Sequence, residues 1–424
     1  NTNVRTEVIG GLTTFFAMAY IIFVNPNFLS QTGMDHTAVM LATCVSAAIG
    51  CFLTAFMANV PFAQAPGMGL NAFFTYTICF GMGYTWQQGL AIVFISGLIF
   101  LAISVSPIRK QIIDSIPAPL KAAISAGIGL FICLIGLLNA GIVTAGNNLL
   151  DLSSITSGPA LLALIGLIIT GILMAWKVKG ALFIGILVTT VIGIPMGVTN
   201  LSNVSISFEG ISIAPTFFKL SFVGLLSKGI LPLLTAIVTF AMCDCFDTVG
   251  TLIGTAGSAG MLDENGNLPR GDKALIADAV ATCTGALMGT STVTTFVESS
   301  TGISEGARTG LSSVVVGILF LLGCVLAPIA GIIPSAATAP ALIIVGMFMI
   351  GNVAKIDWSD VEVALPCFLT IAMMPFAYSI SDGIGFGFIS YTLIKMARGK
   401  FKEVPVLLYI LSALFVVMYI LAAL

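Results

Sequence analysis

The chain has 424 residues, of which 58% are hydrophobic and only 8% are charged, and its mean hydropathy is +1.11. A soluble domain carries roughly 25% charged residues, so this composition excludes one and predicts a protein surrounded largely by lipid. The net charge of −2 supplies no basic patch. A nucleic-acid partner is therefore not expected.

The N-terminal residues do not resemble a cleavable signal peptide. Such peptides begin with a basic region and end in a small-residue cleavage site, whereas Asn1 to Glu7 lead directly into a full-length apolar stretch. We interpret that stretch as the first membrane span.

Apolar runs separated by charged breaks follow along the whole chain. A helix needs about 20 mostly apolar residues to cross the roughly 30 Å hydrocarbon layer, which leaves room for about fourteen spans. Seven runs fall in the first half, at about residues 14–30, 38–59, 70–80, 88–106, 121–142, 158–176 and 181–198. Seven more fall in the second half, at about residues 228–256, 274–289, 299–305, 309–331, 338–353, 360–379 and 382–395.

Two sets of seven runs predict an internal duplication. Because seven is odd, the second copy would run upside down in the membrane, which is the inverted-repeat plan of many secondary transporters. The predicted fold class is an all-α polytopic membrane protein of two inverted seven-span repeats. The apolar stretch Pro405 to Leu424 exceeds this plan. It would either cross as an extra helix or lie along the membrane surface or the bundle.

Basic residues cluster in alternate loops, which predicts their orientation. By the positive-inside rule these loops and the N-terminus are cytoplasmic, with Lys219 and Lys228 as exceptions. The residues concerned are Arg109, Lys110, Lys177, Lys179, Arg270, Lys273, Lys355, Lys395, Arg398, Lys400 and Lys402.

Two segments, in the third place of each repeat, are too irregular to span as helices. Residues Pro61 to Asn71 contain two prolines and two glycines, so we expect extended backbone there, with a helix resuming after Asn71 as its N-cap. Ser291 to Val297 is a β-branched run with strand preference, and Ser299 or Ser300 would cap the half-helix that follows. Interrupted segments at matching places of two halves point to a midplane binding site.

Four acidic residues lie within the apolar runs: Asp244, Asp247, Asp278 and Glu298. Each costs roughly 2.5 to 3.5 kcal/mol at the centre of a spanning helix. The same spans supply no lysine or arginine at comparable depth. Protonation, hydrogen bonds or a bound ligand must therefore offset the cost. Carboxylates at this depth accept hydrogen bonds from the N–H edge of a heterocycle and can also titrate, as coupling to protons requires.

The arrangement of these acids allows two interpretations. Asp247 and Thr251 are four residues apart and share a helix face, with Asp244 on the same side. Glu298 lies at the predicted strand-to-helix break. The functional interpretation is a binding site, and the structural one is a set of capping or interhelical hydrogen bonds.

No signal in the sequence favours an enzyme, a metal site or a disulfide framework. The nine cysteines lie mostly inside apolar runs without CxxC pairs or partner histidines. Gly302 to Gly306 matches the GxSxG pattern of serine hydrolases, but the only histidine is His36, in a loop on the outer side. We expect no cofactor other than a coupling ion, which would be a proton, with sodium left open.

Four motifs, in order along the chain, carry a resemblance to a known family. They are Gly11 to Tyr20 (GLTTFFAMAY), Ala65 to Phe74 (APGMGLNAFF), Phe246 to Leu252 (FDTVGTL) and Thr294 to Gly302 (TTFVESSTG). With them, the chain resembles the nucleobase/cation symporter-2 family, also called the nucleobase/ascorbate transporters, over essentially its whole length. Within that family it is similar to the AzgA-like adenine, guanine and hypoxanthine permeases.

The resemblance implies a core domain and a gate domain, each built from both repeats, with short strands in spans 3 and 10. The core would comprise residues 1–107 (spans one to four) and 226–332 (spans eight to eleven). The gate would comprise residues 108–200 (spans five to seven) and 333–398 (spans twelve to fourteen). Residues 403–424 would be the extra apolar segment. A homodimer formed through the gate domains is also implied.

The resemblance further implies where a purine binds. The substrate-binding set is Asp247, Thr251, Glu298, Ser299, Gly69 and Asn71, and the proton-coupling network is Asp278, Glu298 and Asp247. The position of Thr251 bears His or Asp in the uracil and xanthine relatives, so their proton linkage does not transfer to this chain.

The sequence thus predicts a proton-coupled importer of purine bases in a bacterial-type inner membrane, working by alternating access. The purine preferred among adenine, guanine and hypoxanthine is left open. The alternative from the same architecture is an anion exchanger of the related sulfate-transporter-like fold, which adjacent carboxylates would oppose by repelling the anion.

Overall fold

Every apolar run predicted from the sequence contains a helix in the computed structural model, which describes residues 2–107, 115–146, 149–156, 158–201, 211–263 and 268–423. Arg109 and Lys110, used above for orientation, lie outside the described residues. Among the described residues, eight helical stretches are long and apolar enough to cross a membrane. The protein is therefore a mostly helical, polytopic membrane protein, as predicted.

In the first half, helices follow the predicted runs with one short hairpin among them. The elements are α1 (Val4–Met18), α2 (Ile21–Leu29), α3 (His36–Leu53), β1 (Gln64–Pro66), α4 (Met68–Ala72), the π-helix η3 (Phe73–Gly81), α5 (Trp86–Val105), α7 (Ala118–Asn139), β2 (Val143–Gly146), β3 (Leu149–Leu152), α8 (Gly158–Ala175) and α9 (Ala181–Gly193).

The second half repeats this order of long helices around a short strand. Its elements are α10 (Ile230–Ser258), α11 (Gly271–Met288), β4 (Val293–Thr295), α12 (Ser299–Ser304), α13 (Gly310–Gly323), α14 (Ala327–Ala330), α15 (Ser335–Ile350), α16 (Val361–Phe376), α17 (Ile380–Ala397) and α18 (Val406–Ala423). The inverted relation of the halves, the count of fourteen spans and the domain boundaries stay predictions.

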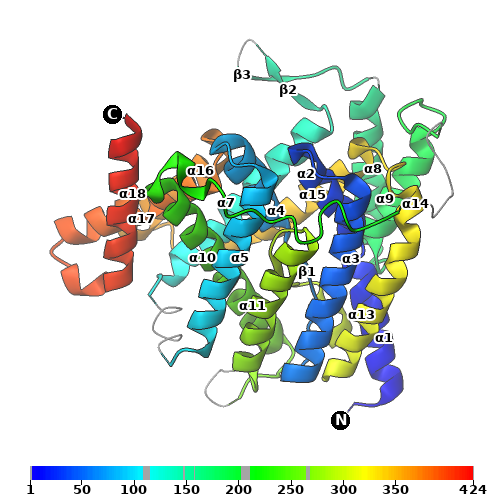
Figure 1. The fold of residues 1–424 in the computed structure, drawn as a ribbon, viewed down its shortest axis with the longest axis horizontal. Coiled ribbons are helices and arrows are strands. Elements are labelled where there is room, and N and C mark those ends of the chain that lie inside the picture. Colours follow the sequence, from blue (N-terminus) through cyan, green and yellow to red (C-terminus); the bar gives the residue numbers. More distant parts are fainter. Residues whose placement is uncertain are drawn as a thin grey trace.

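The helices pack in two groups (Figure 1). Helices α1, α3, α5, α11 and α13 pack on one another, and α7 packs on α15 and α16, with α8, α9 and α17 beside them. Small residues allow close approach inside the second group. A Cβ on Gly129 of α7 would lie 2.7 Å from the carbonyl oxygen of Gly346 in α15, so the backbones of these helices touch.

Strands β1 and β4, far apart in sequence, pair antiparallel at the centre of the first group. Gln64 lies opposite Thr295 and Pro66 opposite Val293, and all residues of both strands are buried. Backbone bonds extend the pair at each end, from Gly67 N to the Thr292 carbonyl and from Phe296 N to the Ala63 carbonyl. The pairing satisfies backbone groups that lipid would leave unbonded.

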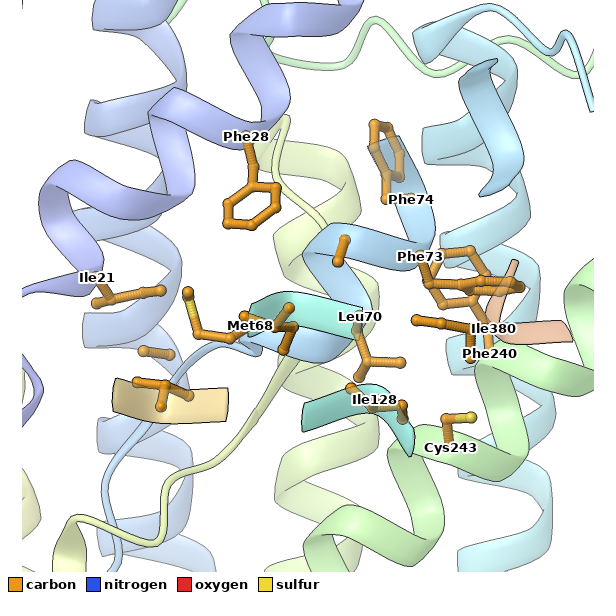
Figure 2. Close-up of a cluster of buried hydrophobic side chains, with 14 of the residues drawn as sticks. Ile21, Phe28, Met68, Leu70, Phe73, Phe74, Ile128, Phe240, Cys243 and Ile380 are labelled. Carbon is orange, nitrogen blue, oxygen red and sulfur yellow. The ribbon is translucent and has the colours of Figure 1, made fainter. Parts of the chain in front are cut away.

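Apolar side chains fix the half-helix that leaves β1 (Figure 2). Phe73 packs edge to face on Phe240 of α10, with ring centroids 4.7 Å apart. Leu70 lies beside Ile128 of α7, and Phe28 of α2 covers the other side. The half-helix is thus held by side chains of α2, α7 and α10.

The structure corrects both predicted helix caps. Helix α4 begins at Met68, four residues earlier than expected, because Asn71 N already donates to the Gly67 carbonyl and closes the first helical turn. No side chain caps α12, whose N-cap position is Glu298. The hydroxyl of Ser299 instead accepts a hydrogen bond of 3.0 Å from Ala63 N in the other segment. Bonds between the two segments therefore override local capping.

The C-terminal stretch forms α18, which packs on α17 and α10 at one edge of the bundle (Figure 1). The basic cluster before it is neutralised by acids. Lys395 bonds to Glu362 at 3.0 Å and to Glu403 at 2.8 Å, and Lys400 bonds to Glu362 at 2.7 Å. The hydrogen bond from Lys395 lowers the pKa of Glu403.

Candidate functional site

Glu298 lies where β4 turns into α12, and a tyrosine from the first span holds it. Helix α1 ends at Met18 and α2 begins at Ile21. This break directs the buried Tyr20 toward the crossing, where its hydroxyl donates a 2.7 Å hydrogen bond to Glu298 Oε1. Glu298 itself is half-buried.

A cavity of about 470 Å³ borders Glu298 and separates the two helix groups. One wall comes from α1 and the β4–α12 segment, and the other comes from the α8–α9 connection and α15. Its lining includes Thr13, Glu298 and Thr301 on the first side and Lys177, Lys179 and Phe348 on the second. This volume is in the range that holds small ligands.

Asp247 and Thr251 lie on one face of α10. The Asp247 side chain is exposed, and it is not part of the lining of the cavity beside Glu298. It is close enough to Glu298 for their charges to interact. Thr251, one turn further, is half-buried.

Gly69 and Asn71 belong to the half-helix on the other side of the crossing. A Cβ on Gly69 would lie 2.6 Å from Ile128 Cγ2, so this glycine allows α4 to touch α7. Asn71 is fully buried, and its Oδ1 accepts a hydrogen bond from the hydroxyl of Ser291. Its Nδ2 has no hydrogen-bond partner.

Asp278 lies behind the strand pair and does not reach the cavity. It is fully buried in α11, and its Oδ1 accepts hydrogen bonds from the Thr295 hydroxyl at 2.8 Å and from Gln64 Nε2 at 3.3 Å. The buried Ser299 is likewise engaged by the backbone of Ala63. Both residues hold the crossing together in this structure.

The structure therefore divides the predicted site residues into two sets. Glu298 borders the cavity, Asp247 is exposed and Thr251 is half-buried, whereas Asn71, Asp278 and Ser299 are buried between the crossing segments. Their roles as ligands stay predictions. Among these three buried residues, Asn71 is the one that presents an unpartnered donor.

Sequence reasoning missed three residues here. Tyr20 is the last residue of the first motif. A tyrosine inside an apolar span needs a hydrogen-bond partner for its hydroxyl, and this was the signal that could have identified it. Gln64 lay in the extended segment without a visible partner. Lys121 of α7 lies with its Nζ 5.1 Å from the Phe246 ring centroid, beside Asp247 in sequence. This lysine comes from a different helix than the acids, so its position in the sequence did not mark it as their neighbour.

No group of three or more His, Cys, Asp or Glu residues suited to a metal ion occurs in the part of the chain that the structure describes. The GxSxG stretch ends helix α12, where the Ser304 hydroxyl donates to the Thr301 carbonyl at 2.6 Å. This is not the strand-to-helix turn that a nucleophilic serine requires.

Comparison with known proteins gives the family and the fold. A family described as "Permease family" matches residues 5–386. The guanine/hypoxanthine permease PbuG of Bacillus subtilis (strain 168) is 46% identical over 429 residues, 99% of this chain and 97% of its own length. The adenine permease AdeP of Escherichia coli (strain K12) is 41% identical over 418 residues, 98% of this chain and 92% of its own length.

Among solved structures, the transmembrane domain of the cyanobacterial bicarbonate transporter BicA is similar, with a TM-score of 0.68 and 17% identity. The match covers 90% of this chain and 97% of that domain. At this identity the likeness shows a shared fold of core and gate helices, and nothing about the substrate.

Proposed function

The chain belongs to the nucleobase/ascorbate transporter family, whose members are membrane permeases and not enzymes, and from that premise we propose that it imports purine bases together with protons by alternating access. The relatives named for guanine, hypoxanthine and adenine support a purine as the substrate. The single structural observation behind the proposal is the Glu298 carboxylate, held at the strand crossing and open to a cavity between the two helix groups.

In the proposed bound state, carboxylates meet the N–H edge of the purine. Glu298 and Asp247 accept from ring or exocyclic N–H groups, and the unpartnered Nδ2 of Asn71 donates to a ring nitrogen or carbonyl. Gly69 presents backbone from the same side. Tyr20 occupies Oε1 of Glu298 and so fixes which oxygen faces the ligand.

Such a pocket would select purines sharply. A site that hydrogen-bonds its substrate rejects analogues lacking the matching group, because its own buried polar atoms would be left unpaired. Coupling follows if a proton joins the network of Glu298, Asp247 and Asp278 when the purine binds, since protonation removes charge that would otherwise be costly to move through the membrane.

Alternating access would exchange the open and closed sides of this cavity. The cavity is lined by Lys177 and Lys179, in a connection that the positive-inside rule assigns to the cytoplasm. The opposite side is closed between the helix groups. Asn27 Nδ2 donates to the Thr338 hydroxyl at 3.0 Å, and Tyr378 packs edge to face on Tyr76 at 5.6 Å between ring centroids. We assign this structure to the inward-open state.

The proposal also includes the membrane, the orientation of the chain and its oligomeric state. We place it in the inner membrane with the N-terminus in the cytoplasm, where Glu7 and Glu305 lie near the basic residues Arg308 and Lys179. A homodimer through the gate helices remains part of the proposal. Anion exchange is not favoured, because Asp247 and Glu298 would repel an anion and the likeness to a bicarbonate transporter concerns fold alone.

Uptake of labelled adenine, guanine and hypoxanthine tests the proposal. We expect Glu298→Ala and Asp247→Ala to abolish uptake of each purine that the wild type imports, while Asp357→Asn, in an exposed connection, leaves it unchanged. Membrane insertion of each variant is checked by its amount in purified membranes. Normal uptake by both alanine variants would remove the assigned site.

A further inference from the structure

Asp244 is a buried acid that does not line the cavity and has no place among the proposed ligand contacts. It lies on α10, is 1% exposed and faces α11 and strand β4. Thr248, one turn further along α10, lies on the same helix face as Asp244. Its hydroxyl is 2.8 Å from the hydroxyl of Thr294, which shows that this face is turned toward β4. Asp244 therefore lies directly behind the strand that carries Glu298.

The Thr282 hydroxyl joins Asp244 to that strand, and Thr294 of β4 lies beside the same carboxyl group. Thr282 Oγ1 of α11 lies 2.8 Å from Asp244 Oδ2 and 3.0 Å from the Val293 carbonyl oxygen. A carbonyl oxygen only accepts, and a threonine hydroxyl has a single proton to donate. If Thr282 donates to Val293, the proton between Thr282 and Asp244 must come from Asp244.

The Val293 carbonyl needs this donor. Along an antiparallel pair, successive carbonyls point alternately toward the partner strand and away from it. Thr292 uses its carbonyl for Gly67 N of the other segment, so the carbonyl of Val293 points away from β1, toward α11. Pro66, the residue opposite Val293, has no N–H to offer.

The surroundings of Asp244 also favour a bound proton. Its Oδ1 has no hydrogen-bond partner, although it is buried. The titratable groups that face it are acids and thiols, since α5 and β4 contribute none within their bounds. They are Asp278 and Cys283 on α11 and Asp247, Cys243 and Cys245 on α10. An ionised Asp244 would thus be a buried charge beside two other acids and three neutral thiols, which is strongly unfavourable.

The lysines of other helices near α10 have partners of their own. Lys121 lies over Phe246, two residues from Asp244, and its charge also acts on Cys245. Helix α18 meets α10 near Thr235, whose hydroxyl contacts Met418 Sδ at 3.3 Å. On α17, Lys395 pairs with Glu362 and Glu403.

We propose that Asp244 is a proton-binding residue whose protonation state is transmitted to strand β4 through Thr282. This inference rests on the proposed proton-coupled transport and names the residue that senses the proton. With the proton bound, Asp244 donates to Thr282 and Thr282 donates to Val293. When the proton leaves to water, the Thr282 hydroxyl turns to the carboxylate, and the Val293 carbonyl loses its donor. The strand that positions Glu298 then changes its hydrogen bonding.

The first test is infrared difference spectroscopy on the purified protein. The carbonyl stretch of a protonated carboxyl group is separate from that of a carboxylate. We expect Asp244→Asn to remove one protonated-carboxyl band at neutral pH, and Asp357→Asn to remove none. An unchanged band in Asp244→Asn overturns the proposal, whatever the protein transports.

The second test uses proteoliposomes with an imposed pH gradient. An amide donates the same hydrogen bond to Thr282 as a protonated carboxyl group, so Asp244→Asn should keep purine counterflow within about threefold of wild type. It should lose gradient-driven accumulation and the pH dependence of uptake. Accumulation at the wild-type level in this variant contradicts the proposal.

Thr282 variants separate transmission from proton binding. Thr282→Val should keep the protonated-carboxyl band, shifted to higher frequency by the lost acceptor, and should lose accumulation. Thr282→Ser should behave like the wild type in both measurements. If Thr282→Val accumulates purine normally, the link to β4 is wrong. If the wild type itself shows no purine counterflow, the proposed function fails independently of the infrared result.

Discussion

The two segments that cross at β1 and β4 share one plan, a short strand followed by a helix, but their side chains serve different purposes. In the first segment Gln64 and Asn71 are fully buried and bond to the second segment or to α11. In the second, Val297 is 57% exposed and Glu298 borders the cavity. A backbone plan common to both segments therefore carries unequal side chains: the first segment is a buried anchor, and the second borders the cavity.

The largest effect should come from placing charge in the anchoring segment. Gln64→Glu adds a carboxylate beside the buried Asp278, and an uncompensated buried charge costs about 3 to 5 kcal/mol. We expect a large fall in the thermal unfolding midpoint in detergent. Gln87→Glu, in the first turn of α5, should leave the midpoint nearly unchanged. Equal midpoints for the two variants would mean that the first segment is not the closed anchor described here.

A smaller effect should follow from releasing Glu298 from its tyrosine. Tyr20→Phe removes a hydrogen bond to a carboxylate, worth about 1.5 to 3 kcal/mol. Purine affinity should fall roughly 10- to 100-fold, since 1.4 kcal/mol is a factor of ten. Uptake kinetics over a range of pH provide the measurement, because a freed Glu298 should also shift the pH profile. An unchanged profile with unchanged affinity would show that Tyr20 does not position Glu298.

The contact of the anchoring segment with α7 should matter slightly less. Gly69→Ala forces a methyl group against Ile128, and overpacking of this kind costs about 1 to 3 kcal/mol. We expect slower uptake, because under the proposed alternating access α4 and α7 would move relative to each other. The double variant Gly69→Ala, Ile128→Ala removes the clash and should recover much of the rate. Failure of this rescue would show that Gly69 acts through the ligand and not through packing.

The smallest effect should come from the ion pair that links the end of α12 to the α8–α9 connection. Lys179 bonds to Glu305 at 2.7 Å, and both side chains are substantially exposed. Exposed pairs contribute about 0 to 1 kcal/mol. Lys179→Gln should therefore change uptake less than about fivefold. A larger loss, matched by Glu305→Gln, would make this pair part of the gating machinery.

The positions of the helices and of both interruptions could be predicted from the sequence because their causes are local. Twenty apolar residues form a span, Pro61 and Pro66 break a helix, and the run of threonine and valine before Glu298 favours a strand. The pairing of Gln64 with Thr295 could not be predicted, since it joins residues 231 positions apart.

The two errors in helix capping also come from contacts between residues far apart in the sequence. Asn71 and Ser299 are good helix caps by residue type, but each bonds across the crossing, and a long-range hydrogen bond replaces the local one. The cavity and the contact of Tyr20 with Glu298 likewise depend on how separate helices pack. Sequence alone proposed Asp247 and Glu298 as acids of the candidate site and left their surroundings undetermined.

Equilibrium binding of labelled purine to the purified protein tests the central claim most directly. Glu298→Gln keeps the shape of the side chain and removes its charge, so we expect at least a tenfold weaker affinity in a protein whose unfolding midpoint is unchanged. If Glu298→Gln binds adenine, guanine and hypoxanthine as tightly as the wild type does, the carboxylate at the strand crossing is not where the base is held.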